Sequence, residues 1–280
     1  MNGDIGVLVT ESNYNQFINA KKVELGINVH IEEGTYIGAI GGKADYVLLG
    51  DNVYIGKDCT ILLPVFTLGD YCTIHRQCRI SGYNCCNIGH NFWMDQNCII
   101  NCTDKVTIGN NVGIGAYSQL WSHIKFGDVM EGCRFNSTKP MVIGDDVWFV
   151  GHCIVAPIKA AKRSMALIGS VITGDMKENH IYGGTPATDL TEKLGTQFAN
   201  RTIEQKMGWI QNQFKEFCIS HPDAVNQIKI VDKINNTDLI ESNSSIFEVS
   251  SRTYIKRRNK LEISFMKFLL PLSKFIPKGD

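Results

Sequence analysis

The chain has 280 residues, of which 44% are apolar and 20% are charged, and its formal net charge at pH 7 is zero. This length and composition are typical of a globular protein with a large core. A zero net charge argues against recruitment of nucleic acid or of an acidic membrane surface by a strong field. No run of apolar residues approaches the roughly 18 that a membrane-spanning helix needs.

Residues 1–24 are predicted to form an N-terminal cap. They read as a short strand from Ile5 to Val9 and a helical piece from Asn15 to Lys22. Such a cap would cover the open end of a stacked repeat, which starts at about residue 25. Because the first residues have neither the basic start nor the apolar stretch of a signal peptide, we expect a cytoplasmic protein.

A six-residue rhythm is the main feature of residues 25–190. An aliphatic residue followed by glycine recurs as Leu49-Gly50, Ile55-Gly56, Leu68-Gly69, Ile88-Gly89, Ile108-Gly109, Ile114-Gly115, Ile143-Gly144 and Ile168-Gly169. A period of six fits neither an amphipathic helix nor one alternating strand. Repetition of this kind is typical of a parallel β-helix of short strands and tight turns.

Each hexad supplies one side of a coil. Its first residue is a large aliphatic that points inward, and its fifth is a smaller apolar residue that also points inward. The Gly-Asp/Asn-Asn between them, as in Gly109 to Asn111, suits turns with unusual backbone angles. Three hexads would close a triangular coil of about eighteen residues, which stacks on its neighbours through backbone hydrogen bonds.

Ten cysteines are present, and their spacing does not suggest disulfides or zinc. Five of them stand four residues after an inward residue, where the repeat needs a small apolar side chain: Cys59, Cys72, Cys78, Cys98 and Cys153. A buried thiol behaves as a compact hydrophobe and stays free in a reducing compartment. No pair has the Cys-x-x-Cys spacing of a zinc site, so we expect no metal.

Two segments depart from the repeat. Residues 124–142 contain no hexad and are rich in Gly, Asp, Asn and Pro, so we expect a long loop that leaves the coil, and such loops are usually functional. Residues 191–280 are expected to form a C-terminal extension of helices and strands. Their pattern predicts helices over 202–220 and 261–270 and strands over 227–231 and 246–255.

These features resemble a known family. The hexads, the block from Ile143 to His152, and the run Gly169 to Asp175 followed by Gly183-Gly184-Thr185-Pro186-Ala187 are similar to the hexapeptide-repeat acyltransferases, above all the sugar O-acetyltransferases such as galactoside and maltose acetyltransferases. The resemblance implies a mainly β, left-handed parallel β-helix. It also implies a homotrimer with an active site between neighbouring subunits.

The resemblance assigns the catalytic role to His123, which stands before the loop and about twenty residues ahead of the Trp block. Acetyl transfer from a thioester to a hydroxyl needs a base near neutrality, and imidazole serves. A backbone N–H at Gly151 corresponds to the donor for the oxyanion. The oxyanion and cofactor candidates for acetyl-CoA are Gly151, Trp148, Ile168, Gly169, Ser170, Thr173 and Lys177. Trp148 is equally well explained as outer-face packing.

The acceptor expected from the resemblance is a sugar or nucleotide-linked sugar used in surface polysaccharide synthesis. The substrate-binding candidates are Asn101, Thr103, Asp104, Asp95, Trp121 and Glu131. Turn capping explains Asn101, Thr103 and Asp104 equally well. N-acetylation of an amino-sugar nucleotide is an alternative, in which Asp95 or Glu131 would face an ammonium group. A zinc-dependent carbonic anhydrase of similar fold needs a close pair of histidines, which this sequence lacks. A non-catalytic trimeric scaffold is a further possibility.

Overall fold

A computed structural model describes residues 6–235 and 244–278 of the chain. The chain divides into two compact units, Met1–Phe198 and Ala199–Asp280. The first unit extends beyond the last coil, where the Asn179 amide donates to Phe198 O at 3.0 Å and its Oδ1 accepts the Phe198 N–H at 2.9 Å. Within the described ranges, no helix is both long and apolar enough to cross a membrane.

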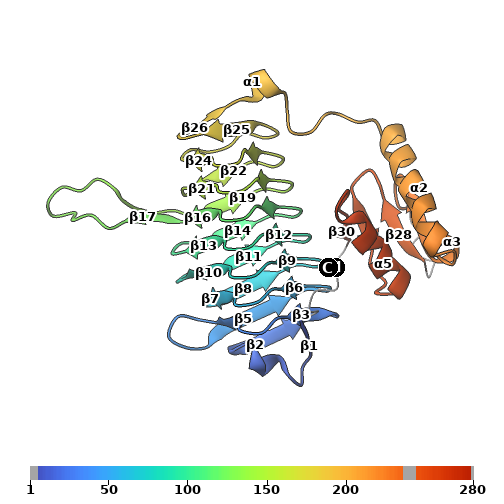
Figure 1. Cartoon of the computed structure of the whole chain (residues 1–280), viewed down its shortest axis with the longest axis horizontal. Coiled ribbons are helices and arrows are strands. Elements are labelled where there is room, and N and C mark those ends of the chain that lie inside the picture. Colours follow the sequence, from blue (N-terminus) through green and yellow to red (C-terminus); the bar gives the residue numbers. More distant parts are fainter. Residues whose placement is uncertain (1–5, 236–243, 279–280) are drawn as a thin grey trace. The chain divides into compact units, whose positions relative to one another are not determined.

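The first unit is a triangular coil whose three sides are sheets of parallel strands, apart from the antiparallel end strands β1 and β26 (Figure 1). Face 1 contains β1 (Val7–Val9), β3 (Val29–Ile31), β6 (Tyr54–Ile55), β9 (Thr73–Ile74), β12 (Trp93–Met94), β15 (Gly113–Ile114), β20 (Trp148–Phe149), β23 (Met165–Ala166), β25 (Ile181–Gly184) and β26 (Ala187–Asp189). Face 2 contains β4 (Tyr36–Gly38), β7 (Thr60–Leu62), β10 (Arg79–Gly82), β13 (Ile99–Cys102), β16 (Gln119–Trp121), β21 (Ile154–Val155) and β24 (Val171–Ile172). Face 3 contains β2 (Ala20–Leu25), β5 (Ala44–Leu49), β8 (Val65–Leu68), β11 (Cys86–Ile88), β14 (Val106–Ile108), β19 (Met141–Ile143) and β22 (Lys159–Ala160).

The chain visits the three faces in turn, so the predicted fold class, a left-handed parallel β-helix with an excursion and an α+β extension, is confirmed. The coil length differs from the expected eighteen residues. Thr73 pairs with Trp93 and Trp93 pairs with Gly113, which gives a repeat of 20 residues in the middle of the helix. The extra residues lie in face 2, where β10 and β13 are each four residues long.

The Gly and the Asn of the corner segments have separate roles. At the corner between faces 3 and 1, the positive φ belongs to the Asn that follows, with 55° at Asn91 and 61° at Asn111. Glycine is required for space, because a Cβ added to Gly69 would lie 2.7 Å from the Gly89 backbone of the next coil. The prediction that the Gly-Asp/Asn-Asn segments form tight corners with unusual backbone angles is confirmed, and the positive φ belongs to the second Asn.

Polar side chains at this same corner connect successive coils. The N–H groups of Asp51, Asp70 and His90 donate to Asp70 Oδ1, His90 Nδ1 and Asn110 Oδ1 of the next coil, at 2.8, 2.9 and 2.8 Å. The Asn110 N–H continues the series to Asp145 Oδ1 at 2.6 Å. Each turn amide therefore has a partner although it lies outside the strands.

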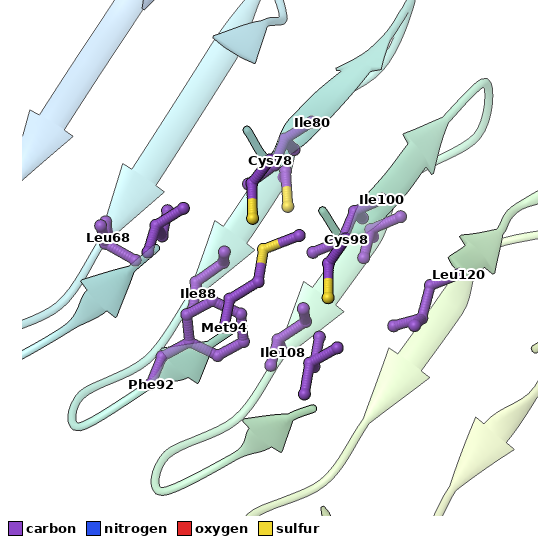
Figure 2. Close-up of a cluster of buried hydrophobic side chains, with 14 of the residues drawn as sticks. Leu68, Cys78, Ile80, Ile88, Phe92, Met94, Cys98, Ile100, Ile108 and Leu120 are labelled. Carbon is purple, nitrogen blue, oxygen red and sulfur yellow. The ribbon is translucent and has the colours of Figure 1, made fainter. Parts of the chain in front are cut away.

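The cysteines predicted as core filler are buried and unpaired, which confirms their structural role. Cys78 and Cys98 lie among aliphatic side chains of the interior (Figure 2). Each donates its thiol to a carbonyl of the next coil, Cys78 to Asp95 O at 3.0 Å and Cys98 to Gly115 O at 3.2 Å. Burial raises the pKa of the Cys72 and Cys153 thiols, which keeps them protonated and unreactive.

The N-terminal prediction is partly wrong. The strand β1 is present and pairs antiparallel with β3 at the open end of the coil, while Ile5 lies outside the described residues. The expected helix over 15–22 is absent: a single 3-10 turn, η1 (Tyr14–Gln16), precedes β2. Residues 20–25 form a strand because they pair in register with β5, from Ala20↔Ala44 to Leu25↔Leu49, and this pairing outweighs their local helix preference.

The second unit is a four-stranded sheet with helices. Its elements are α2 (Ile203–Ser220), α3 (Ala224–Gln227), β27 (Ile228–Val231), β28 (Ser245–Glu248), β29 (Thr253–Ile255), α5 (Lys260–Leu269) and β30 (Ile276–Pro277); the short α1 (Thr191–Leu194) belongs to the first unit. Both predicted helices are confirmed, and the strand expected over 246–255 is an antiparallel pair, β28 and β29. Phe265 packs on Phe217 and Phe247, with ring centroids 5.0 and 5.1 Å apart.

Enlarging a core thiol should destabilise the coil. Cys98 is fully buried, and the next residue in its column, Ser118, has 0% exposure. We expect Cys98→Leu to lower the free energy of unfolding by about 1–3 kcal/mol through overpacking, and Cys98→Ser to be tolerated much better. Denaturant titration of both variants checks this. A leucine variant as stable as the natural chain would contradict the packing described for this column.

Candidate active site

His123 stands where the chain leaves the coil. It follows the last residues of β16 on face 2 and begins β17 (His123–Lys125), the first strand of the excursion. The excursion leaves the coil at the corner between faces 2 and 3, and the Lys139 N–H donates to Ser122 O at 3.1 Å across its base. The half-buried imidazole of His123 lies at this base. The structure places the predicted catalytic residue at the mouth of the loop, as the sequence suggested.

Asn101 is the direct partner of His123. The imidazole Nδ1 lies 2.8 Å from Asn101 Oδ1. Asn101 belongs to β13, whose pairing with β16 sets Asn101 opposite Trp121. The in-register stacking of two coils thus brings together residues that are 22 positions apart in the chain.

Further groups converge on the same amide oxygen. The Thr103 N–H and the Ser122 hydroxyl donate to Asn101 Oδ1 at 3.1 and 3.2 Å, and Ser122 Oγ accepts the Asp104 N–H at 3.0 Å. Three of the predicted acceptor-binding residues, Asn101, Thr103 and Asp104, are thus gathered at His123, and the last two enter through their backbone.

Trp121 packs against the imidazole. The two ring centroids are 5.8 Å apart and the planes are inclined by 67°. The indole is itself held, since its Nε1–H donates to Gln119 Oε1 at 3.2 Å. Trp121 therefore limits the movement of the His123 ring on one side.

The excursion is a two-stranded ribbon that projects from the coil (Figure 1). Its strands β17 and β18 (Asn136–Thr138) pair antiparallel, with His123 opposite Thr138. The predicted end at residue 142 is too late, because Met141 is buried in β19 and pairs with Val106. Glu131 lies near the exposed tip, where its N–H donates to Asp128 Oδ1 at 3.2 Å, and no contact with His123 is formed in the described residues.

A second group of candidates lies at the corner between faces 1 and 2. Gly151 is buried there with a φ of +152°, a conformation that favours glycine. The Gly169 N–H donates to the Gly151 carbonyl at 2.9 Å, so the candidate Gly169 lies one coil further along. Asp95 lies at the same corner, two coils before Gly151. The Asp95 N–H donates to Ile114 O of the next coil, and the Gly115 N–H of that coil donates to Phe149 O of the coil that contains Gly151.

Trp148 lies on the outer surface of face 1 and is 42% exposed. Its Cδ1 would lie 3.1 Å from a Cβ added to Gly113, so the indole leans over this glycine. Packing on the outer face, one of the two explanations considered from sequence, therefore describes its contact within the chain.

The other cofactor candidates are scattered. Ser170 is fully buried, and its hydroxyl donates to Leu167 O at 2.6 Å as part of the column that holds the core thiols. Thr173 is exposed after β24, and exposed Lys177 donates its N–H to the Tyr182 hydroxyl at 2.9 Å. The prediction that Ile168 points inward is wrong: it is 67% exposed, because the strand β23 places Ala166 inside instead.

His123 and Gly151 lie at opposite ends of face 2. The His152 N–H donates to Ala116 O at 2.8 Å, which aligns the Gly151 corner with the corner that precedes β16. From Ala116 the chain takes seven residues along face 2 to reach His123, which at about 3.3 Å per residue is at most roughly 23 Å. The two predicted elements of the mechanism are therefore not brought together within one chain.

Ser122 was missed by sequence reasoning. It is fully buried and bridges the Asp104 N–H to Asn101. Its only sequence signal is its position next to His123, since its partners come from the previous coil. Within the described residues, no cluster of three or more His, Cys, Asp or Glu side chains is arranged to hold a metal ion.

Comparison with known proteins finds relatives among acetyltransferases. The chain is 33% identical over 116 residues to a candidate acetyltransferase of Saccharomyces cerevisiae, which covers 39% of this chain and 58% of the yeast protein. It is 29% identical over 109 residues to galactoside O-acetyltransferase of Escherichia coli, which covers 38% of this chain and 53% of that protein. The chain thus spans little more than half the length of these relatives. No protein-family model matches.

Among solved structures, the hexapeptide-repeat acetyltransferase VCA0836 of Vibrio cholerae is 25% identical with a TM-score of 0.36, over 51% of this chain and 71% of that one. The N-acyltransferase AntD of Bacillus cereus, in complex with dTDP and coenzyme A, is 15% identical with a TM-score of 0.43, over 75% and 99% of the two chains. Over about 110 residues the chain is therefore similar in sequence to acetyltransferases.

Proposed function

We propose that the protein transfers an acetyl group from acetyl-CoA to a hydroxyl of a sugar or nucleotide-linked sugar, with His123 as general base. The observation that carries the proposal is the imidazole at the base of the excursion, whose Nδ1 bonds Asn101 Oδ1 at 2.8 Å and leaves Nε2 for the substrate. The relatedness to acetyltransferases, one of them named for galactosides, supports the reaction class and the acceptor class.

The proposed reaction uses His123 at one end of face 2 and the Gly151 N–H at the other. Acetyl-CoA supplies the acyl group as a thioester. His123 Nε2 takes the hydroxyl proton while the oxygen attacks the carbonyl carbon, and the imidazolium then returns that proton to the departing thiolate. In the described part of the chain, the Gly151 N–H donates to no acceptor, so it is free to stabilise the carbonyl oxygen as negative charge develops there.

The proposal includes a homotrimer. Because His123 and Gly151 lie at opposite ends of face 2, the site is completed only if the His123 corner of one copy meets the Gly151 corner of another. The excursion supports such contacts, since Phe126, Met130 and Phe135 are 102%, 85% and 71% exposed on the ribbon. Exposed apolar groups at this density are typical of a protein interface.

The proposal also includes a cytoplasmic location and a role in surface polysaccharide synthesis. All ten cysteines are free, which is the usual state of thiols in a reducing compartment.

The groups near Gly151 suit the apolar arm of coenzyme A. They are small or apolar, namely the exposed Ile168 and Gly169, which has open space beside its Cα.

Loss of the His123 imidazole should remove the base. We expect His123→Ala to lower turnover by about 10²- to 10⁴-fold, measured as release of free coenzyme A with a panel of sugars, amino sugars and their nucleotide derivatives. His30→Ala, which removes a half-buried histidine bonded to Asn28 O on an early coil, is the matched control and should retain full turnover.

Unchanged turnover in His123→Ala would show that another group is the base. Turnover only with amino sugars would identify the N-acetyltransferase alternative instead. If the natural chain acetylates none of the acceptors, the proposed enzymatic function is wrong and a non-catalytic scaffold is the better explanation.

Mixing two inactive variants tests whether the site is shared between copies. We expect Gly151→Ala to lose about 10- to 100-fold in turnover, because φ near +152° is strained for alanine and the N–H would be misdirected. Co-assembly of His123→Ala with Gly151→Ala subunits at equal amounts should restore up to about one quarter of the natural activity, the statistical share of sites with both groups intact. No recovery from mixed trimers would place both groups in one subunit.

A further inference from the structure

We propose that Asn101 is a positioning residue, which holds His123 in the tautomer that carries its proton on Nδ1, and that it does not bind the sugar acceptor. The inference rests on the proposed function, in which Nε2 is the base. It changes the role of Asn101 from a ligand of the substrate, as the sequence suggested, to the group that prepares the base.

The orientation of the Asn101 amide is set by a donor that cannot change. The Thr103 N–H points at the atom assigned as Oδ1, at 3.1 Å. A backbone N–H is always a donor, so the side-chain atom facing it must be the oxygen and cannot be the amide nitrogen.

The Ser122 hydroxyl gives a second, independent constraint. Its oxygen accepts the Asp104 N–H at 3.0 Å, so its own proton is directed elsewhere. The remaining partner is Asn101 Oδ1 at 3.2 Å, which again must be an acceptor. Since Ser122 is fully buried, this bond is formed away from water and is costly to break.

These two constraints determine the state of the imidazole. His123 Nδ1 lies 2.8 Å from the same oxygen, and two acceptors would repel at that distance. Nδ1 therefore carries the proton and donates it, which leaves the lone pair of neutral imidazole on Nε2. The ring cannot turn over easily, because the Trp121 indole packs against it at 5.8 Å between centroids.

The same contacts leave Asn101 Oδ1 no capacity for a sugar hydroxyl. An amide oxygen has two lone pairs, and here it already accepts from Thr103, Ser122 and His123. Hydroxyl recognition must come from other groups. Asn101 thus acts on the reaction only through the imidazole.

The choice of an amide over a carboxylate has a consequence for pH dependence. A neutral oxygen orients the ring without the strong stabilisation of imidazolium that a negative charge supplies. Titratable side chains on the elements around the ring are Cys102 on β13, Asp104 and Lys105 after it, Lys125 on β17 and Lys139 after β18, and they stay the same in every variant below. A change in pH profile on replacing Asn101 therefore reports the one bond at Nδ1.

The first experiment observes the tautomer without any substrate. Long-range ¹H–¹⁵N NMR of the ¹⁵N-histidine-labelled full chain, assigned with His123→Ala, should show protonated Nδ1 and unprotonated Nε2 for His123 above the titration range. In Asn101→Ala the His123 signals should move toward a mixture of tautomers. A natural chain with its proton on Nε2 would overturn the proposal, whatever its enzymatic activity.

The second experiment uses the isosteric change Asn101→Asp. The added charge should move the acid limb of the kcat/KM profile to higher pH by about one unit, so that activity falls on the acid side and recovers as pH rises. Asn101→Ala should lower kcat by about 10- to 100-fold, less than removal of the base itself, with KM for the acceptor little changed. Asn87→Asp, which adds the same charge at a half-buried residue of β11, is the control and should leave the profile in place.

The outcomes separate this inference from the proposed function. If His123→Ala abolishes turnover while Asn101→Ala raises the acceptor KM and leaves kcat and the NMR tautomer unchanged, Asn101 is an acceptor ligand and the inference is wrong. If His123→Ala keeps full turnover, the proposed base is wrong, and the NMR result still decides whether Asn101 sets the tautomer.

Discussion

The in-register stacking of coils is the constraint on which the rest of the structure depends. A coil of short strands can satisfy its backbone groups only through the coils before and after it, so each residue is tied to the residue at the same place in the next coil. The pairs Ile80↔Ile61 and Ile80↔Ile100 show this for the core of face 2. The side-chain acceptors from Asp70 to Asp145 extend the same rule to the corners, where no strand is present.

The His123 side of the candidate site lies where the regular coil is interrupted. A long insertion within a strand would break bonds to two coils, whereas an insertion at a corner leaves both neighbouring strands paired. The excursion obeys this limit, because β16 and β19 on its two sides remain in register with β13 and β14. The corner between faces 2 and 3 then offers polar groups of two coils to one side chain, and His123 is placed there.

The repeat pattern in the sequence was enough to predict most of the coil. The period of the sequence corresponds to the repeated geometry of the coil. It was therefore enough to identify the aliphatic-Gly pairs, the inward cysteines and the place of the excursion. Ile168 shows where this reasoning fails: its pair with Gly169 looks like another hexad, yet a shorter coil brings Ala166 inside and leaves Ile168 exposed. Residues 20–22 were wrongly assigned to a helix because only their pairing with β5 makes them part of a strand.

The candidate site was predictable in its residue types and less so in its roles. The resemblance to the hexapeptide-repeat acyltransferases located His123 before the excursion, and Asn101, Thr103 and Asp104 in the stretch from which similar enzymes contact the sugar. Their hydrogen bonds could not be predicted from the sequence, because the role of each residue depends on which of its atoms faces a partner in the neighbouring coil. Ser122 is the clearest case: a serine next to a histidine carries no signal until the Asp104 N–H and Asn101 Oδ1 are seen on either side of it.

A crystal structure of the protein with coenzyme A and a sugar acceptor tests the central claim most directly. The acceptor hydroxyl should lie within hydrogen-bond distance of His123 Nε2, with Nδ1 still bonded to Asn101, and the sulfur of coenzyme A should lie beside Gly151 of a neighbouring subunit. An acceptor bound away from His123, or a ring turned so that Nε2 faces Asn101, would contradict the mechanism.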